Sequence, residues 1–390
     1  MTGPIRLVFQ NDFYDGQLAR TLSASYAGMA DLGEAFAAAH AIGKPTLDTW
    51  YAEWNRRAEA ALTAGDASAA AGQRESARSQ YLRASEYFRQ SFFFLRHNLA
   101  DPRLLSAYHE QVASFQKALP MLGAHGEAFA FPYDGTTLKA YRYAPDDAPI
   151  ARPTMLFPCG YDSTAEEVWT NVPAALARGY NAVTFEGPGQ GAALYEQGLF
   201  FRPDFNAVLT PLIDQLAADP RIDLTRLVLV GRSFAGYLAP QAATVEHRIA
   251  ALICDPAQPD MAAHLPTGIV GKVAVPAIEA KMRFSPDSRE FFGARMAAHG
   301  LDSPADYLDT LKTYTMLDQA NEIRCPTLIV ECEGDPVGGG GAALASAMGT
   351  KATLKHLSVA SGAGGHCGWL GQQVWDDVVY GWLGETLSGS

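Results

Sequence analysis

The first third of the chain carries its apolar residues at helical spacing. Between residues 77 and 95 they recur at steps of three and four, and the stretch 105–119 repeats this spacing. Such a pattern places them on one face of a helix. Several aromatic residues between 87 and 94 lie outside this face, which indicates helices packed on more than one side. We expect an all-helical N-terminal cap domain over residues 1–122, with these aromatics in its core and a few of them in a pocket roof.

The pattern changes after Gly123. The stretch EAFAFPYDGTTLKAYRY predicts two short strands around an Asp134–Gly135 turn. Apolar runs such as PTMLFPCG, NAVTFEGPGQG, RLVLVGRS, IAALICDP, PTLIVECEGDP and ATLKHLSVA then alternate with helical stretches. This alternation predicts an α/β domain over residues 123–390, with a mostly parallel sheet covered on both faces. A helical insertion at about 261–317 is expected to form part of a pocket wall.

Composition and net charge limit the classes of molecule that the protein is expected to bind. The chain has 390 residues, 48% of them hydrophobic, and a net charge of −12. The length suits one large or two medium domains, and the negative charge argues against nucleic acid or an anionic membrane as a partner. The N-terminal stretch has neither a basic segment nor a long apolar segment, so we expect no signal peptide and a cytoplasmic protein.

Cysteine and histidine spacing gives no sign of a disulfide framework or a metal site. The five cysteines are scattered without a C-x-x-C pair, and the nine histidines form no H-x-x-x-H pattern. We therefore predict reduced, buried cysteines, no metal and no cofactor. The glycine-rich GPGQG at residues 187–191 lacks the spacing of a phosphate-binding loop, and we interpret it as a tight turn lining the pocket.

The stretch RLVLVGRSFAGYLAPQAA places a serine between a strand and a helix. Ser233 directly follows the apolar run, with Gly231 before it and Ala235 and Gly236 after it. A nucleophile elbow needs small flanking residues, because strand and helix backbones pass closely there. Alanine stands where the usual G-x-S-x-G pattern has its second glycine. The alternative is an ordinary polar turn, but the strand-to-helix context favours a nucleophile.

An acid and a histidine follow in the order that such a nucleophile requires. Asp335 lies in the loop after the run ending at Val330, with Glu333 as the alternative acid. His366 lies in a glycine-rich loop before the last helix, where an imidazole can reach the sheet edge. Asp335 could instead be a turn residue before proline. We predict that Ser233, Asp335 and His366 form a catalytic triad.

Two backbone N–H groups are expected to form an oxyanion hole. One belongs to Phe234, directly after the serine, and the other to Tyr161, in the loop Pro158–Asp162. The alternative is a plain loop in which Asp162 or Ser163 caps a helix at about 163–177. Two glutamates, 166 and 167, would then lie in the first turn of that helix, where negative charge suits the dipole.

These motifs make the chain resemble α/β-hydrolases that carry an N-terminal helical domain. The resemblance rests on PCGYDSTAEE, on the stretch from FRPDF through GRSFAG to PAQPD, on EGDP and on GAGGHC, and it covers most of residues 125–390. The group includes 2,6-dihydroxypseudooxynicotine hydrolase and fungal yellowish-green-type hydrolases, with FrsA-like esterases as more distant kin. The departures are Ala235 and Cys159, where such proteins often carry glycine.

The resemblance implies a substrate pocket between the helical domain and the sheet, and a homodimer. It also implies cleavage of an activated carbon–carbon bond in a 1,3-diketone-like compound, or of an ester, in a small aromatic or polyketide-like substrate. Amide hydrolysis, acyl transfer, cyclisation and a binding role without catalysis are the alternatives. Asp260 follows a strand near the expected site, where it would either orient a polar substrate group or be a solvated loop residue or a helix N-cap.

Overall fold

Helices precede the first strand, as predicted. The computed structural model describes residues 6–122, 125–263, 265 and 268–387. Side-chain caps start several helices: Asn11 accepts the N–H groups of Phe13 and Tyr14, and Thr46 forms a capping box with Thr49. The helices of this region are α1 (Asp12–Ala24), α2 (Leu32–Ile42), α3 (Leu47–Ala70), α4 (Arg74–Phe92) and α5 (Pro102–Ala118).

The rest of the described chain builds one eight-stranded sheet, ordered β1-β2-β4-β3-β5-β6-β7-β8. The first two strands are antiparallel to their neighbours, and β3 to β8 run parallel. Asp134 and Gly135 make the predicted turn with φ of 41° and 79°. The strands are β1 (His125–Tyr133), β2 (Thr136–Ala144), β3 (Arg152–Pro158), β4 (Asn181–Phe185), β5 (Ile222–Arg232), β6 (Ile249–Asp255), β7 (Thr327–Cys332) and β8 (Ala352–Leu357).

Alternate residues of each central strand face two different hydrophobic cores. On β5, Val228 and Val230 belong to one cluster, while Leu227 and Leu229 belong to the other. The second cluster is covered by α8 (Asn206–Leu216), α9 (Ala235–Ala243) and α13 (Gly341–Met348). The first is covered by α6 (Val172–Ala177) and α14 (Gln372–Leu387). The run of apolar residues in each strand follows from this burial on both faces.

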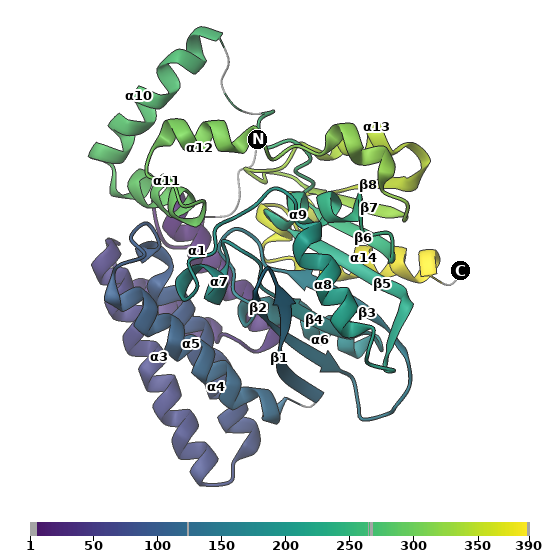
Figure 1. The fold of residues 1–390 in the computed structure, drawn as a ribbon. Coiled ribbons are helices and arrows are strands. Elements are labelled where there is room, and N and C mark those ends of the chain that lie inside the picture. The colour runs from purple at the N-terminus through teal and green to yellow at the C-terminus, as the bar shows by residue number, and fades with distance from the viewer. Residues whose placement is uncertain (1–5, 123–124, 264, 266–267, 388–390) are drawn as a thin grey trace.

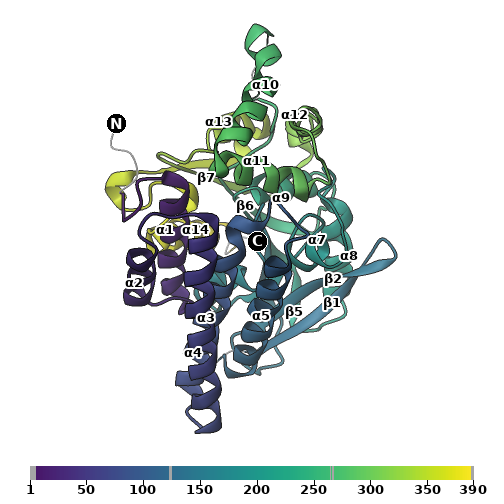
Figure 2. The ribbon, with the colours of Figure 1, turned by 90° about the vertical axis from the view of Figure 1, so that its left-hand side faces the viewer.

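The N-terminal helices share the first of these cores. Their buried residues, Trp50, Phe88 and Phe115 among them, form a single cluster with Tyr141 of β2 and Val228 of β5. Figure 1 shows α3, α4 and α5 beside the sheet, and Figure 2 shows the same helices from the side. The predicted domain boundary at 122/123 adjoins residues 123–124, which lie outside the described residues.

The predicted insertion consists of α10 (Gly268–Phe284), α11 (Pro286–Ala298) and α12 (Pro304–Leu311). It has a small core of its own, with Met296, Tyr307 and Leu311 at its centre. In both views α10 projects away from the rest of the molecule (Figures 1 and 2). No helix in the described part of the chain is long and apolar enough to cross a membrane.

One predicted helix starts later than expected. The segment 163–166 is irregular, and a 3₁₀ turn over Glu167–Asn171 leads into α6 (Val172–Ala177). Pro173 has no N–H to continue the earlier turn, so α6 starts afresh around it. The polar residues of segment 163–166 are therefore free to contact other parts of the molecule, as the site shows.

Candidate active site

Ser233 lies at a strained turn between β5 and α9. Its φ is 58°, a left-handed conformation that few residues other than glycine adopt, and its N–H donates to the Asp255 carbonyl at 2.8 Å. A Cβ on Gly231 would lie 2.1 Å from the Ala235 carbonyl oxygen, and one on Gly236 would lie 1.8 Å from that of Pro256. The close approaches thus fall on 231 and 236. Ala235 is accommodated where the sequence departs from the usual pattern.

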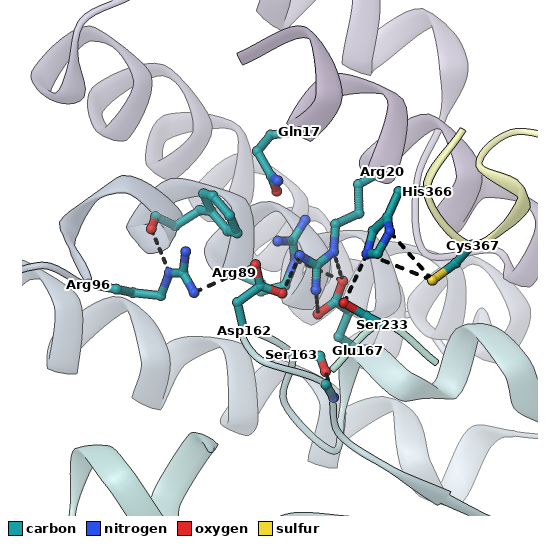
Figure 3. Close-up of polar contacts among 12 residues, drawn as sticks. Gln17, Arg20, Arg89, Arg96, Asp162, Ser163, Glu167, Ser233, His366 and Cys367 are labelled. Atoms are coloured by element: carbon teal, nitrogen blue, oxygen red, sulfur yellow. Dashed lines mark hydrogen bonds and ion pairs between the residues drawn. The ribbon is translucent and has the colours of Figure 1, made fainter. Parts of the chain in front are cut away.

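The three residues of the predicted triad lie in hydrogen-bonding contact. Nε2 of His366 is 2.9 Å from Oγ of Ser233, and its Nδ1 is 2.9 and 3.0 Å from the two carboxylate oxygens of Asp335. Figure 3 shows His366 beside Ser233. The Asp335 side chain has no exposed surface, whereas the imidazole is 42% exposed. Glu333, the alternative acid, accepts the N–H of Val359 instead.

The surroundings of His366 favour its charged form. Burial lowers the pKa of the imidazole, but the adjacent Cys367 sulfur and the Asp335 carboxylate outweigh burial and hold that pKa well above its usual range. Burial raises the pKa of the Cys367 thiol. The geometry therefore suits a base whose protonated form is stabilised.

Arg232, the residue between glycine and serine in the motif, holds the histidine loop. It donates to Asn171 Oδ1 at 2.7 Å, to Gln372 Oε1 at 2.9 Å and to the Cys367 carbonyl. It also forms an ion pair with Asp255 at 3.4 Å. Burial raises the pKa of Asp255 to about 6. Sequence reasoning missed Arg232, because its partners lie far away in the chain.

The loop that carries Tyr161 lies directly against Ser233. A Cβ on Gly160 would be 3.3 Å from both the Ser233 Cβ and the Arg232 carbonyl oxygen. Within the described residues, the N–H groups of Tyr161 and Phe234 donate to no other atom of the chain. Two unpaired N–H groups next to a serine are the feature that an oxyanion hole requires.

Hydrogen bonds from the Gln190 side chain hold this loop in position. Its Nε2 donates to the carbonyl oxygens of Cys159 at 2.7 Å and Gly160 at 2.9 Å, while its Oε1 accepts the Gly187 N–H. The GPGQG segment was predicted as a tight turn lining the pocket. Its function in the structure is more specific, since its glutamine determines the position of the loop beside Ser233.

Ser163 and Asp162 do not cap a helix. Ser163 Oγ accepts the Gly160 N–H at 2.7 Å and so closes the loop on itself. Asp162 accepts from Arg20 of α1 at 2.8 Å, and Arg20 also donates to both carboxylate oxygens of Glu167. Burial raises the pKa of Asp162, but Arg20 and Arg96 outweigh burial and hold it well below its usual range.

Residues 166 and 167 lie at the N-cap and in the first turn of the 3₁₀ helix Glu167–Asn171, and their side chains also bind other parts of the molecule. Glu166 is fully buried and accepts from Lys139 at 2.8 Å and from the Tyr141 hydroxyl at 2.7 Å. Glu167 pairs with Arg20 across the boundary to the N-terminal helices. Figure 3 shows Arg20, Arg89 and Arg96 gathered around Asp162 and Glu167. These ion pairs connect the helical region to the loop beside the nucleophile.

Asp260 closes its own loop. Its Oδ1 accepts the Ala262 N–H at 2.8 Å, and its backbone forms a β-bridge with Thr315. This arrangement matches the alternative interpretation, and a contact of Asp260 with substrate stays a prediction. The five cysteines are reduced and buried.

One group in the described chain could hold a metal ion: the side chains of Asp335, His366 and Cys367, whose ligand atoms lie within 4.8 Å of one another. Both nitrogens of His366 already have hydrogen-bond partners, in Ser233 and Asp335. The absence of a metal and of a cofactor stays a prediction.

Fold and site together define a hydrolase-type α/β architecture, and comparison with known proteins agrees. A model of the alpha/beta hydrolase family matches residues 155–379. The hydrolase acrC of Aspergillus aculeatus is 32% identical over 360 residues, 82% of each chain. The 20-hydroxy-prefusarin hydrolase FUS2 of Gibberella moniliformis is 31% identical over 353 residues, covering 83% of this chain and 82% of the relative. The chain belongs to the alpha/beta hydrolase family.

The fold of the whole chain also has a solved counterpart. The structure of 2,6-dihydroxy-pseudo-oxynicotine hydrolase matches with a TM-score of 0.73 at 20% identity, over 91% of this chain and 95% of that one. The match extends through the N-terminal helices. The predicted fold class, an α/β-hydrolase sheet with a helical N-terminal region, is confirmed.

Proposed function

We propose that the chain is a serine hydrolase in which Ser233 attacks a substrate carbonyl. His366 takes the serine proton, and Asp335 orients the imidazole and stabilises its charged form. The observation that carries the proposal is the position of His366, whose two nitrogens lie 2.9 Å from Ser233 and from Asp335. The strained φ of Ser233 supports it, since such strain concentrates at functional positions.

The tetrahedral intermediate would be stabilised by the N–H groups of Tyr161 and Phe234. Both are free to bind a developing oxyanion, and removal of one such donor typically costs about 10²–10³-fold in kcat. Collapse of the intermediate forms an acyl-enzyme as the leaving group departs. Imidazolium at His366 then protonates that group, and a water activated by the same residue releases the acid.

The substrate class that we propose is a small aromatic or polyketide-like acyl compound. The aromatic rings of Tyr161, Phe201 and Phe234 pack within 5.0 Å of one another beside the nucleophile. Relatives that act on 20-hydroxy-prefusarin and 2,6-dihydroxy-pseudo-oxynicotine support the same class. The scissile bond is either an ester bond or the carbon–carbon bond of a 1,3-diketone, whose enolate leaving group His366 can protonate.

Product analysis by mass spectrometry tests this proposal. Wild type and Ser233→Ala are each incubated with aryl 1,3-diketones and with aryl esters of the same acyl group. Conversion of a diketone into an acid and a ketone by wild type alone supports carbon–carbon cleavage. Cleavage of esters alone rejects the diketone substrate and retains the serine mechanism.

A fluorophosphonate probe separates the remaining alternatives. If neither substrate class reacts but the probe labels Ser233, amide hydrolysis, acyl transfer or cyclisation replaces the proposed reaction. If wild type is folded and Ser233 is not labelled, the serine mechanism itself is rejected. Assembly as a homodimer and a cytoplasmic location are further parts of the proposal, and light scattering of the purified protein tests the first.

A further inference from the structure

Tyr161 connects the loop beside the nucleophile to the helical insertion. Its backbone belongs to the loop that Gln190 fixes, but its ring packs against residues of other segments. Ring centroids lie 5.0 Å from Phe201, 4.5 Å from Phe234 and 5.7 Å from His299. His299 is the C-cap residue of α11, so the ring extends from the loop into the insertion.

A short hydrogen bond joins Tyr161 to His299. The Tyr161 hydroxyl is 2.5 Å from Nε2 of His299, and Nδ1 of the same imidazole is 3.3 Å from the Tyr314 hydroxyl. The hydroxyl of Tyr307, on α12, lies 3.4 Å from that of Tyr161. We call Tyr161, His299, Tyr307 and Tyr314 the tyrosine–histidine cluster.

The imidazole in this cluster is neutral near physiological pH. His299 is 8% exposed, and burial together with the charge of Arg295 lowers its pKa to about 4. A neutral imidazole has one donor and one acceptor nitrogen, and each meets a hydroxyl that can take the complementary role. The groups facing it are the three tyrosine hydroxyls and Arg295, whose guanidinium lies over the Tyr161 ring at 5.2 Å.

The same cluster supports Phe234, the second predicted oxyanion donor. The centroid of the Phe234 ring lies 4.5 Å from that of Tyr161 and 5.7 Å from that of Tyr314. The Phe201 ring packs against Phe234 and His299, with ring centroids 5.0 Å and 5.3 Å apart. The backbone N–H of Phe201 donates to the Ala298 carbonyl at the end of α11. Both residues with free N–H groups beside Ser233 therefore rest on side chains that the insertion supplies or holds.

We propose that His299 is a positioning residue for the oxyanion hole. It holds the Tyr161 side chain, and through it the N–H of the same residue, at the place that the substrate oxyanion occupies. This inference rests on the proposed serine mechanism. It follows that the insertion determines the reactivity of Ser233, because a displacement of a catalytic group by about 1 Å can cost about 10²-fold in rate.

The rate of fluorophosphonate labelling at Ser233 tests this role, because phosphonylation of the serine depends on the oxyanion hole. The measurement can be made without knowing the natural substrate. His299→Leu removes both hydrogen bonds and is expected to slow labelling about 10- to 100-fold. Tyr161→Phe keeps the ring packing, removes only the hydroxyl, and is expected to slow labelling in the same direction. His299→Gln retains an amide that can bond the hydroxyl and is expected to recover part of the rate.

A control variant separates positioning from general damage to the insertion. Ser285→Ala removes the side-chain N-cap of α11, which lies at the opposite end of that helix from His299. It is expected to lower the melting temperature while the labelling rate stays near that of wild type. With an ester substrate, the His299 and Tyr161 variants are expected to lose kcat at nearly constant KM.

The outcomes are distinguishable. Folded wild type that does not label overturns the serine mechanism on which the inference rests. If wild type labels and Tyr161→Phe labels at the same rate, the mechanism stands and the role of the hydrogen bond is overturned. Equal slowing in Ser285→Ala and His299→Leu also overturns it. Non-additive losses in the Tyr161→Phe/His299→Leu double variant support it.

Discussion

The backbone of Ser233 is held in a conformation that is costly for any residue with a side chain. A left-handed φ costs about 1–3 kcal/mol, so surrounding contacts have to enforce it. Here the Ser233 N–H donates to Asp255 and the Gly236 N–H donates back to the Ser233 carbonyl, each at 2.8 Å. The hydroxyl is thereby directed to His366 before any substrate arrives.

Asp335 is expected to influence the pH range of activity through its hydrogen bond with His366. Imidazolium cannot accept the serine proton, so kcat/KM falls as pH drops through the pKa of His366. Asp335 helps to hold that pKa well above its usual range, so the acidic limb of the wild-type profile is expected above pH 6.5. Asp335→Asn is expected to lower kcat by about 10⁴-fold and to move the limb to lower pH. Glu333→Gln is the control, and an equal shift in that variant would contradict the assignment.

Gln190 offers a test of the loop beside the serine. Gln190→Glu keeps the acceptor for the Gly187 N–H but replaces the two donated hydrogen bonds with a carboxylate oxygen facing two carbonyls. We expect kcat to fall about 10- to 100-fold at nearly constant KM, because the loop loses its position. Gln197→Glu is the matched control, since Gln197 donates to the Thr137 carbonyl on the exposed surface. Steady-state kinetics with an aryl ester gives kcat and KM for both variants. An unchanged kcat in Gln190→Glu would show that Gln190 does not position the loop for catalysis.

Among single residues, the sequence allowed us to predict those whose role follows from their position in the chain. Ser233, Asp335 and His366 each follow a strand in a fixed order, so their meeting could be expected. Arg232, Gln190 and His299 act through partners that are distant in sequence, and neither motif nor periodicity indicates such contacts. The ion pairs of residues 166 and 167 were unpredictable for the same reason, because their partners Lys139 and Arg20 belong to other elements.

At the level of elements, the turn between β5 and α9 packs against the end of β6. The contact of Gly236 with the Pro256 carbonyl leaves no room for a methyl group on that face of α9. The helix can approach the sheet only because its first turn lacks a side chain there. Sequence patterning predicted a strand-to-helix turn, and the structure shows that 236, not 235, is the position where glycine is required.

Gly236→Ala is therefore expected to lower the free energy of unfolding by at least about 3 kcal/mol. The matched control is Gly381→Ala in α14, where an added Cβ meets nothing within 4 Å. That change is expected to raise stability by about 0.5–1 kcal/mol, because alanine is the better helix former. Urea unfolding followed by circular dichroism measures the free energy of unfolding of both variants. Similar effects in the two variants would show that the backbone at Pro256 moves aside at little cost.

Element boundaries were predictable where a turn signal marks them and unpredictable where proline intervenes. The hairpin from β1 to β2 lies within a few residues of its predicted position. The segment 163–177 differs, because Pro173 restarts the helix and the residues before it bind across the molecule. Local pattern could not reveal this, since every one of those contacts is tertiary.

On the scale of the whole molecule, the N-terminal helices and one face of the sheet form a single hydrophobic core. The alternation of strands and helices predicted the α/β sheet, and helical periodicity predicted the N-terminal region. Neither pattern indicates that Phe115 of α5 packs on Tyr141 of β2, with ring centroids 5.2 Å apart. A division into two domains, as the sequence suggested, therefore separates parts that bury the same apolar surface.

A chain limited to residues 123–390 is expected to be insoluble or to bind the dye ANS strongly. Its exposed sheet face would then carry an apolar patch larger than soluble monomers tolerate. Replacing α10 with a short glycine–serine linker is the control, because among the described residues the main contacts of α10 are with α11 and α12. This variant is expected to keep a cooperative melting transition. Soluble, cooperatively folding protein from residues 123–390 would contradict a shared core.

The shared core also bears on how the chain folds during synthesis. The N-terminal helices leave the ribosome first, but their cluster is completed by Val330 of β7 and by Trp375, Val379 and Leu383 of α14. Those residues are made last, so the apolar face of the helices stays uncovered for almost the entire period of translation. Uncovered apolar surface of this kind leads to aggregation of nascent chains. We therefore expect the yield of this protein in a cell to depend on chaperones that bind nascent chains, more than its final stability would suggest.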